Sequence, residues 1–114
     1  IARNQGNSLA ENARLFALIS VAQADAAIVC WEAKYRYNLW RPITAIQQAA
    51  RDANPATEPD AAWNHLLPAP PFPAYPSGHS TFSKASAQVL TQFHGTDALT
   101  FVTGSDSLPG VFRT

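Results

Sequence analysis

Apolar residues in the first third of the chain recur at helical spacing and cover more than one narrow stripe. The stretch LFALISVAQADAAIVCW shows this pattern, and neither Pro nor Gly occurs between Ser8 and Tyr37. A helix that is apolar on most of its surface is one that packs on several sides. Ser8 and Glu11 have the Ser-x-x-Glu spacing of a capping box. The pattern therefore predicts a long helix from Ser8 to about Tyr37 that is packed on several sides.

Proline and glycine divide the rest of the chain into shorter elements. Pro42 ends the first helix, because the residue before a proline avoids the α region, and it suits the first turn of a second helix that reaches about Ala53. Residues 54–76 are rich in proline and form a long loop, which needs a reason in a compact domain. A third helix is expected from Ser77 to Phe93, followed by a tail with turn signals. Because strand signals are almost absent, the sequence predicts an all-α helical bundle.

Charge is sparse and balanced along the chain. Lys and Arg total 8, Asp and Glu total 8, and charged residues make up 14% of the 114 residues. This balance gives no whole-surface case for binding nucleic acid or an acidic membrane. A charged fraction this low indicates that part of the surface is normally covered, by the remainder of a parent chain or by another copy in a homo-oligomer. The expectation is one partial helical domain over residues 1–114.

Three further features limit the function classes. The single cysteine, Cys30, lies in an apolar run, which predicts a buried thiol and excludes an intrachain disulfide or a zinc site built from cysteines. No run reaches the ~20 apolar residues of a membrane span, because Gln23 and Asp25 interrupt the nearest candidate. The chain opens at Ile1 with no signal-like segment, so it is expected to be a processed or partial chain whose compartment cannot be read.

The tetrapeptide Pro76-Ser77-Gly78-His79 stands at the start of the predicted third helix. The first N–H groups of a helix have no intrahelical partner and carry the positive end of its dipole. Gly78 would let an anion approach the backbone, and the Ser77 hydroxyl would add a donor. A histidine such as His79 can move a proton near neutral pH. The same residues also suit an ordinary helix start, and a Ser–His nucleophile pair is disfavoured because adjacent side chains seldom align.

A second cluster of cations lies in the stretch KYRYNLWRP, residues 34–42. Lys34 and Arg41 are seven residues apart, two helical turns, so both are expected on one side of the first helix. An ammonium and a forked guanidinium can bind different edges of a tetrahedral oxyanion. Trp31, one turn earlier, would screen the stems of these side chains from water. A solvated pair of cations is the alternative, because positive charge is favoured at the end of a helix.

The order of these two motifs resembles the signature of the vanadium-dependent haloperoxidase and type 2 phosphatidic acid phosphatase superfamily. The wider sequence, from about Leu9 to Arg113, is more similar to bacterial vanadium chloroperoxidase-type proteins than to lipid phosphatases. The resemblance implies a helical bundle that binds vanadate or phosphate between helices.

The resemblance also implies a role for each motif residue. Lys34 and Arg41 would contact the equatorial oxygens of the anion, Ser77 and Gly78 would donate further hydrogen bonds, and His79 would be the acid–base residue. Vanadate is the expected cofactor. Hydrogen peroxide, a halide and a small organic acceptor are the expected partners. Four aromatic residues near the motifs could line a pocket for the halide or the acceptor: Trp31, Trp40, Phe72 and Tyr75.

Three functions remain open from the sequence. A haloperoxidase would oxidise a halide with peroxide, an acid phosphatase would use the same site for phosphomonoesters, and a non-catalytic helical module would dock the stretch PAPPFPAYP on a partner. The third motif of the family, Ser-Arg followed by five residues and His, is not present. The resemblance therefore implies that the vanadium-ligating histidine lies beyond Thr114 and that this chain alone is inactive. His94 is expected at a helix end, and His65 has no assigned role.

Overall fold

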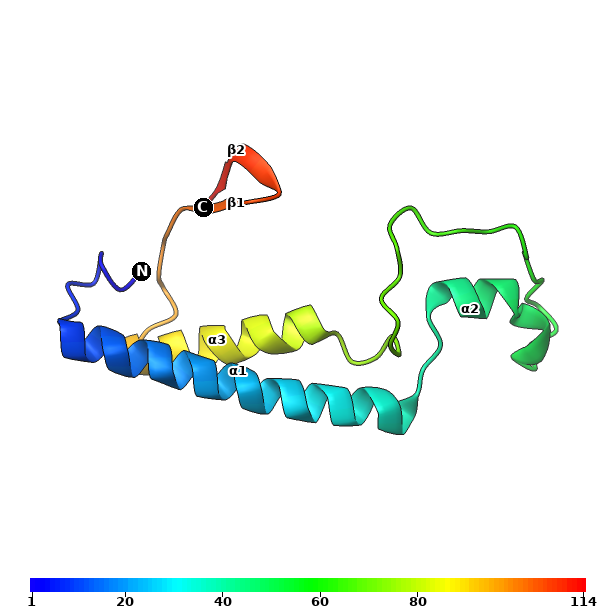
Figure 1. Ribbon diagram of the computed structural model, residues 1–114, viewed down its shortest axis with the longest axis horizontal. Helices are drawn as coiled ribbons and strands as arrows, with labels where there is room; N and C mark the ends of the chain where they lie inside the picture. The colour runs from blue at the N-terminus through cyan, green and yellow to red at the C-terminus, as the bar shows by residue number, and fades with distance from the viewer. The chain divides into compact units, whose positions relative to one another are not determined.

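The computed structural model describes all 114 residues, and most of its regular structure is helical. The chain divides into two compact units: a terminal unit, residues Ile1–Asp25 with Phe82–Thr114, and a central unit, residues Ala26–Thr81. The mostly helical structure confirms the predicted fold class, whereas the expectation of one partial domain stays a prediction. The elements in order (Figure 1) are α1 (Leu9–Tyr37), α2 (Pro42–Gln47), the 3₁₀ helix η1 (Ala49–Arg51), α3 (Gly78–His94), β1 (Thr103–Ser105) and β2 (Leu108–Arg113).

The start of α1 is the capping box that the sequence predicts. The Ser8 hydroxyl accepts a hydrogen bond from the Glu11 N–H at 3.3 Å, and the Glu11 carboxylate accepts from both the N–H and the hydroxyl of Ser8 at 2.7 Å. These bonds satisfy donors that have no partner inside the helix. The hydrogen bond from the Ser8 N–H, and after it the bond from the hydroxyl, holds the pKa of the Glu11 carboxyl below its ordinary value of 4.5.

Replacing Ser8 with alanine is expected to lower the free energy of unfolding by about 1 kcal/mol, the usual cost of losing an N-cap.

Because the pKa of Glu11 is lower in the folded chain than in the unfolded chain, its stabilising effect is present above pH 4.5 and is lost as the pH falls through the folded value. Glu11→Gln should therefore flatten the dependence of stability on pH in acid. Urea unfolding from neutral pH to about pH 3 measures both effects. Ser83→Ala, at an exposed position of α3, is the control, and a Ser8→Ala variant as stable as the control would contradict the capping account.

In the terminal unit, the first part of α1 packs beside α3 (Figure 1). The Gln23 amide donates to the Ser86 hydroxyl at 2.8 Å, and the Arg14 guanidinium lies 5.8 Å from the centroid of the Phe93 ring. Because Gln23 follows Arg14 whereas Ser86 precedes Phe93, the two helical segments run antiparallel. Leu15, which is 2% exposed, is the one large side chain that this unit buries fully.

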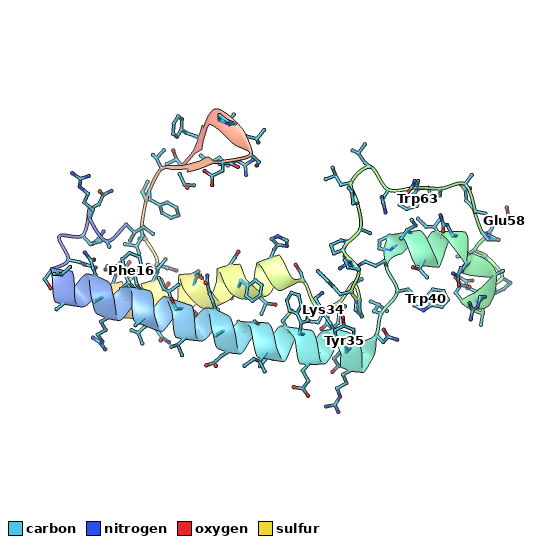
Figure 2. The ribbon with its side chains drawn as sticks, in the orientation of Figure 1. Phe16, Lys34, Tyr35, Trp40, Glu58 and Trp63 are labelled. Carbon is cyan, nitrogen blue, oxygen red and sulfur yellow. The ribbon has the colours of Figure 1, made fainter.

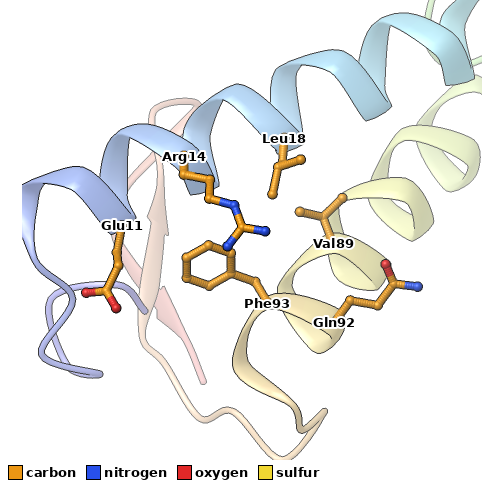
Figure 3. Close-up of a pocket in the computed structure, with 6 residues that line it drawn as sticks. All are labelled: Glu11, Arg14, Leu18, Val89, Gln92 and Phe93. Atoms are coloured by element: carbon orange, nitrogen blue, oxygen red, sulfur yellow. The ribbon is translucent and has the colours of Figure 1, made fainter.

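A groove of about 400 Å³ lies between these two segments (Figure 3). Arg14 extends across it toward the Phe93 ring, and Glu11 at its edge is already bound to Ser8. The groove therefore contains one cation on an aromatic face and no free acid or nucleophile. Its lining consists of Glu11, Arg14, Leu18, Val89, Gln92 and Phe93.

The expectation that α1 is packed on several sides is wrong within this chain. Among the 29 residues of the helix, only Leu15, Cys30 and Lys34 are buried, and the others are exposed or half-buried. Phe16, for example, is 63% exposed. Exposed apolar surface of this kind is typical of sites that contact protein, membrane or ligand. The large apolar residues that α1 leaves exposed include Leu9, Phe16, Leu18, Val21, Ile28 and Val29.

The same helical stretch is relevant to whether the chain has a segment that can cross a membrane. By length and composition alone, Leu9–Gln47 is long and apolar enough to cross a membrane, in spite of Gln23 and Asp25. The core helix of a soluble protein passes the same test. The expected absence of a membrane span therefore stays a prediction.

The second helix is shorter than the sequence predicts. It ends at Gln47 instead of Ala53, and the 3₁₀ turn Ala49–Arg51 follows it. Asp52 then accepts a hydrogen bond from the Asn54 N–H at 2.8 Å. A short polar side chain that bonds to the backbone two residues on competes with the helix, so the helical path does not continue past Arg51.

The proline-rich loop is tied back to α2. The Asp60 N–H donates to the Ile46 carbonyl at 3.1 Å, and the Gln47 amide donates to the Trp63 carbonyl at 2.8 Å. The loop thus supplies partners for the last turn of α2, where helix carbonyls lack intrahelical donors. This anchoring gives the long loop of residues 54–76 a structural reason.

The tail forms a small antiparallel hairpin that the sequence does not predict. Thr103 pairs with Arg113 and Gly104 with Phe112, and a bulge follows at Ser105. All residues of β1 and β2 are exposed. Without a buried face, no alternation of apolar and polar residues is imposed on the sequence, so the usual signal of a strand is missing.

Candidate functional site

The end of α1 separates the two cations of the first motif. The Asn38 N–H donates to the Lys34 carbonyl at 2.8 Å, and Asn38 has a φ of 47°, a left-handed conformation that ends helices and that asparagine tolerates. Arg41 is extended, with φ −71° and ψ 152°, as the residue before α2. The expectation that helical spacing places Lys34 and Arg41 on one side is therefore wrong, because the helix ends between them.

Lys34 lies near the C-terminal end of α1 (Figure 2). It is the one charged side chain that the chain buries fully, at 1% exposed. Its Nζ donates a hydrogen bond to the Pro73 carbonyl at 3.0 Å. The same Nζ lies 5.7 Å from the centroid of the Trp31 ring and 5.0 Å from that of the Phe72 ring, so that aromatic faces screen it. Trp31 thus shields the cation as predicted. None of these contacts is a carboxylate.

Arg41 binds the same part of the proline-rich loop. Its Nε donates to the Phe72 carbonyl at 2.6 Å, and its Cζ lies 4.8 Å from the centroid of the Phe72 ring. The loop, and not the helix, therefore brings Lys34 and Arg41 together on one aromatic ring. The terminal nitrogens of the guanidinium donate to no atom of the chain, so they remain available to a ligand.

The loop then continues along α1 to the second motif. Lys34 bonds the carbonyl of Pro73, and the buried Cys30 thiol donates to the carbonyl of Pro76 at 3.8 Å. Cys30 precedes Lys34 by one helical turn. Ser77, which follows Pro76 and caps α3, therefore lies beside the turn of α1 that precedes Lys34. The burial of Cys30 that the sequence predicts is confirmed.

Ser77 caps α3, as the sequence predicts. Its hydroxyl accepts a hydrogen bond from the Ser80 N–H at 3.3 Å, and α3 begins at Gly78 and ends at His94. The hydroxyl hydrogen of Ser77 and the N–H of Gly78 stay available as donors. His79, in the first turn, is exposed. These groups are the donors that an oxyanion at a helix N-terminus requires.

Both predicted motifs therefore lie in the central unit. Lys34 and Arg41 contact the proline-rich loop, and Ser77 at the start of α3 follows the end of that loop. Sequence reasoning missed the Phe72 and Pro73 carbonyls that anchor the two cations. The signal for them was the density of proline between the motifs, because proline has a carbonyl but no N–H donor to pair with it. The assignment of one shared anion to Lys34, Arg41, Ser77 and Gly78, with His79 as the acid–base residue, stays a prediction.

His65, to which the sequence assigns no role, lies close to this site. Its Nε2 accepts a hydrogen bond from the Ala69 N–H at 3.2 Å. The ring lines a hollow of about 470 Å³ together with Arg41, Thr44 and Phe72. The loop therefore adds an imidazole to the surroundings of Arg41, from a position that no motif indicates.

The four aromatic residues near the motifs do not form one cluster, although Phe72 and Trp40 both border the hollow beside Arg41. Trp31 and Phe72 pack together with ring centroids 5.3 Å apart, and Tyr75 packs on Tyr37 at 5.8 Å. Trp40 borders the hollow of Arg41 and also a second, largely apolar hollow of about 660 Å³. The use of these residues as a pocket for a halide or an acceptor stays a prediction.

Comparisons with known proteins agree with the two motifs. The family described as VCPO second helical-bundle domain matches residues 14–111. The protein named vanadium chloroperoxidase from Curvularia inaequalis is 38% identical over 95 residues, which cover 75% of this chain and 15% of that protein. The chain thus spans a small part of the length of this relative. No solved structure matches the chain.

Proposed function

Because the chain belongs to the family of the VCPO second helical-bundle domain, we propose that it supplies the cationic part of a vanadate site in a haloperoxidase, an enzyme that oxidises a halide with hydrogen peroxide. The membership confirms the family that the two motifs resemble. The observation that carries the proposal is Lys34, a buried ammonium that contacts a carbonyl and two rings but no carboxylate.

A buried charge without a counter-ion is costly. Buried charges in proteins are therefore usually paired or bind a ligand. The Pro73 carbonyl and the faces of Trp31 and Phe72 reduce the cost for Lys34, but they contribute no negative charge. An oxyanion held by Lys34 and Arg41 would supply that charge, in surroundings where charge-assisted hydrogen bonds are strong.

The donors that the chain leaves unpaired are of the kind that can bind the oxygens of vanadate. Lys34 has two N–H groups beyond the one given to the loop carbonyl, and Arg41 has its terminal nitrogens. Ser77 and Gly78 would donate further hydrogen bonds to the same anion, and His79 would hold or deliver a proton at its oxygen. When bound, vanadate supplies the Lewis acid that activates hydrogen peroxide toward the halide.

The proposed partners are hydrogen peroxide, a halide and a small organic acceptor of the oxidised halogen. The chain spans 15% of the length of its relative, so turnover is proposed for a protein that contains these residues together with the rest of the site. The exposed apolar side chains of α1 support such a covering by further protein.

Bromination of an organic acceptor tests the proposal. The longest natural protein that contains these residues is stripped of bound anion, loaded with orthovanadate, and given peroxide and bromide. His79→Ala is expected to lower kcat by at least about 100-fold, the usual contribution of a general acid–base group. Lys84→Ala, at an exposed position on α3, should leave kcat unchanged.

Phosphate is the matched control ligand, because it can occupy the same donors without activating peroxide. No bromination is expected from the phosphate-loaded protein. Bromination that is absent with vanadate, or equal with vanadate and with phosphate, would overturn the proposal. Hydrolysis of a phosphomonoester that vanadate inhibits and His79→Ala abolishes would instead identify an acid phosphatase on the same scaffold.

A further inference from the structure

The hollow beside Arg41 contains a second group that can bind an anion. Its volume is about 470 Å³, and no carboxylate borders it. Among the side chains that line it, only Arg41 and His65 are basic. His65 comes from the proline-rich loop and belongs to neither motif, yet the fold of the loop sets its ring and the guanidinium on the same hollow.

The loop also determines which ring nitrogen of His65 can donate. Nε2 accepts a hydrogen bond from the Ala69 N–H at 3.2 Å. A ring nitrogen that accepts a hydrogen bond carries no proton, so the neutral ring carries its proton on Nδ1. The turn from His65 to Ala69 therefore prepares the ring as a neutral N–H donor.

We propose that His65 is a further oxyanion-binding residue, whose Nδ1–H donates to a tetrahedral anion held by the terminal nitrogens of Arg41. The inference rests on the proposed function in one respect, that Arg41 binds an oxyanion. The Nε of Arg41 is taken by the Phe72 carbonyl, which leaves the terminal nitrogens for the anion. The ligand class is phosphate or orthovanadate.

The two residues would contribute different properties to binding. Arg41 supplies positive charge. The neutral His65 ring would orient the anion, because its single N–H donor bonds one oxygen. Hydrogen bonds to a charged partner are stronger than neutral ones, and losing such a bond is expected to weaken binding by about tenfold. The competing account is that His65 only closes the turn to Ala69.

Two substitutions separate these accounts. In His65→Gln the side-chain oxygen lies as far from the backbone as Nε2, so it can still accept from the Ala69 N–H while the donor at Nδ1 is lost. In His65→Asn the amide nitrogen takes the place of Nδ1, and the bond to Ala69 is lost. Hydrogen exchange at the Ala69 amide reports which variant keeps the turn.

The measurement is a titration of the full chain with phosphate, and then with orthovanadate, followed by ¹⁵N NMR of the histidine rings. The Nδ1 signal of His65 should move together with the Arg41 side-chain signal and with one dissociation constant. His65→Gln should weaken binding by about tenfold and His65→Asn by less. His79→Ala and His94→Ala identify the ring signals.

Phosphate binding that is unchanged in His65→Gln, or a titration that moves Arg41 without His65, would overturn the inference. Either result would leave the proposed function intact, because that function rests on Lys34. A titration that moves His65 and Arg41 but is unchanged in Lys34→Met would support the His65 assignment and contradict the proposed function. The His65 assignment and the proposed function are therefore contradicted by different results.

Discussion

Replacement of Lys34 by methionine is expected to remove most oxyanion binding and to leave the anion-free chain as stable as before or more stable. Methionine has a similar length and no charge, so it can pack on the rings of Trp31 and Phe72 in place of the lysine side chain. Replacing a buried ionic group with an apolar side chain of similar volume is often neutral or stabilising. The anion, by contrast, loses a charge-assisted hydrogen bond, and its affinity should fall by about a hundredfold.

Calorimetry with phosphate measures the affinity, and urea unfolding without phosphate measures the stability. Lys84→Met is the matched control, because Lys84 is exposed on α3 and its loss should change neither quantity. A Lys34→Met variant that binds phosphate like the original chain would show that Lys34 is not an anion ligand. A variant that loses its fold would show that the ammonium serves the structure.

Leu15→Ala is expected to lower the free energy of unfolding by about 3 kcal/mol, through lost burial and the cavity that remains. The effect should be large because the chain has few buried apolar residues, so each of them contributes a large part of the stability. Leu15 is the large one in the terminal unit, where α1 and α3 pack. The fully buried apolar residues of the whole chain are Leu15, Cys30 and Ala49.

The matched control for this change is Leu66→Ala, because Leu66 is 98% exposed. It makes the same chemical change at a position without packing, where the free energy of unfolding should shift by no more than about 0.5 kcal/mol. Urea unfolding followed by circular dichroism measures both variants. Equal stabilities for the two would mean that the burial of Leu15 does not stabilise the chain.

Local chemistry explains what could be predicted from the sequence. Ser8 with Glu11 starts α1, Pro42 starts α2, and Ser77 caps α3, each at the expected position. Caps and prolines act over three or four residues, so their signals lie complete within a short stretch. The bounds of the long helix α1 could also be predicted, because neither Pro nor Gly occurs between Ser8 and Tyr37.

Features that depend on distant segments could not be read in this way. The two cations contact one ring because the loop places Phe72 against both of them, whereas helical spacing predicted that the helix itself would bring them together. The bond from Ala69 that orients His65 depends on the path of the proline-rich loop, for which no periodicity exists. The apolar pattern of α1 predicted packing on several sides, but the chain buries only Leu15, Cys30 and Lys34 of this helix, because periodicity does not show which segments lie against it.

The central claim is that the two motifs serve one anion, and a titration of the ¹⁵N-labelled chain with orthovanadate tests it most directly. The account predicts that the Gly78 amide, the Lys34 ammonium and the Arg41 guanidinium shift together with a single dissociation constant, and that phosphate reverses the shifts. A titration that moves the cations and leaves Gly78 unchanged, or that gives the two motifs different dissociation constants, would contradict it.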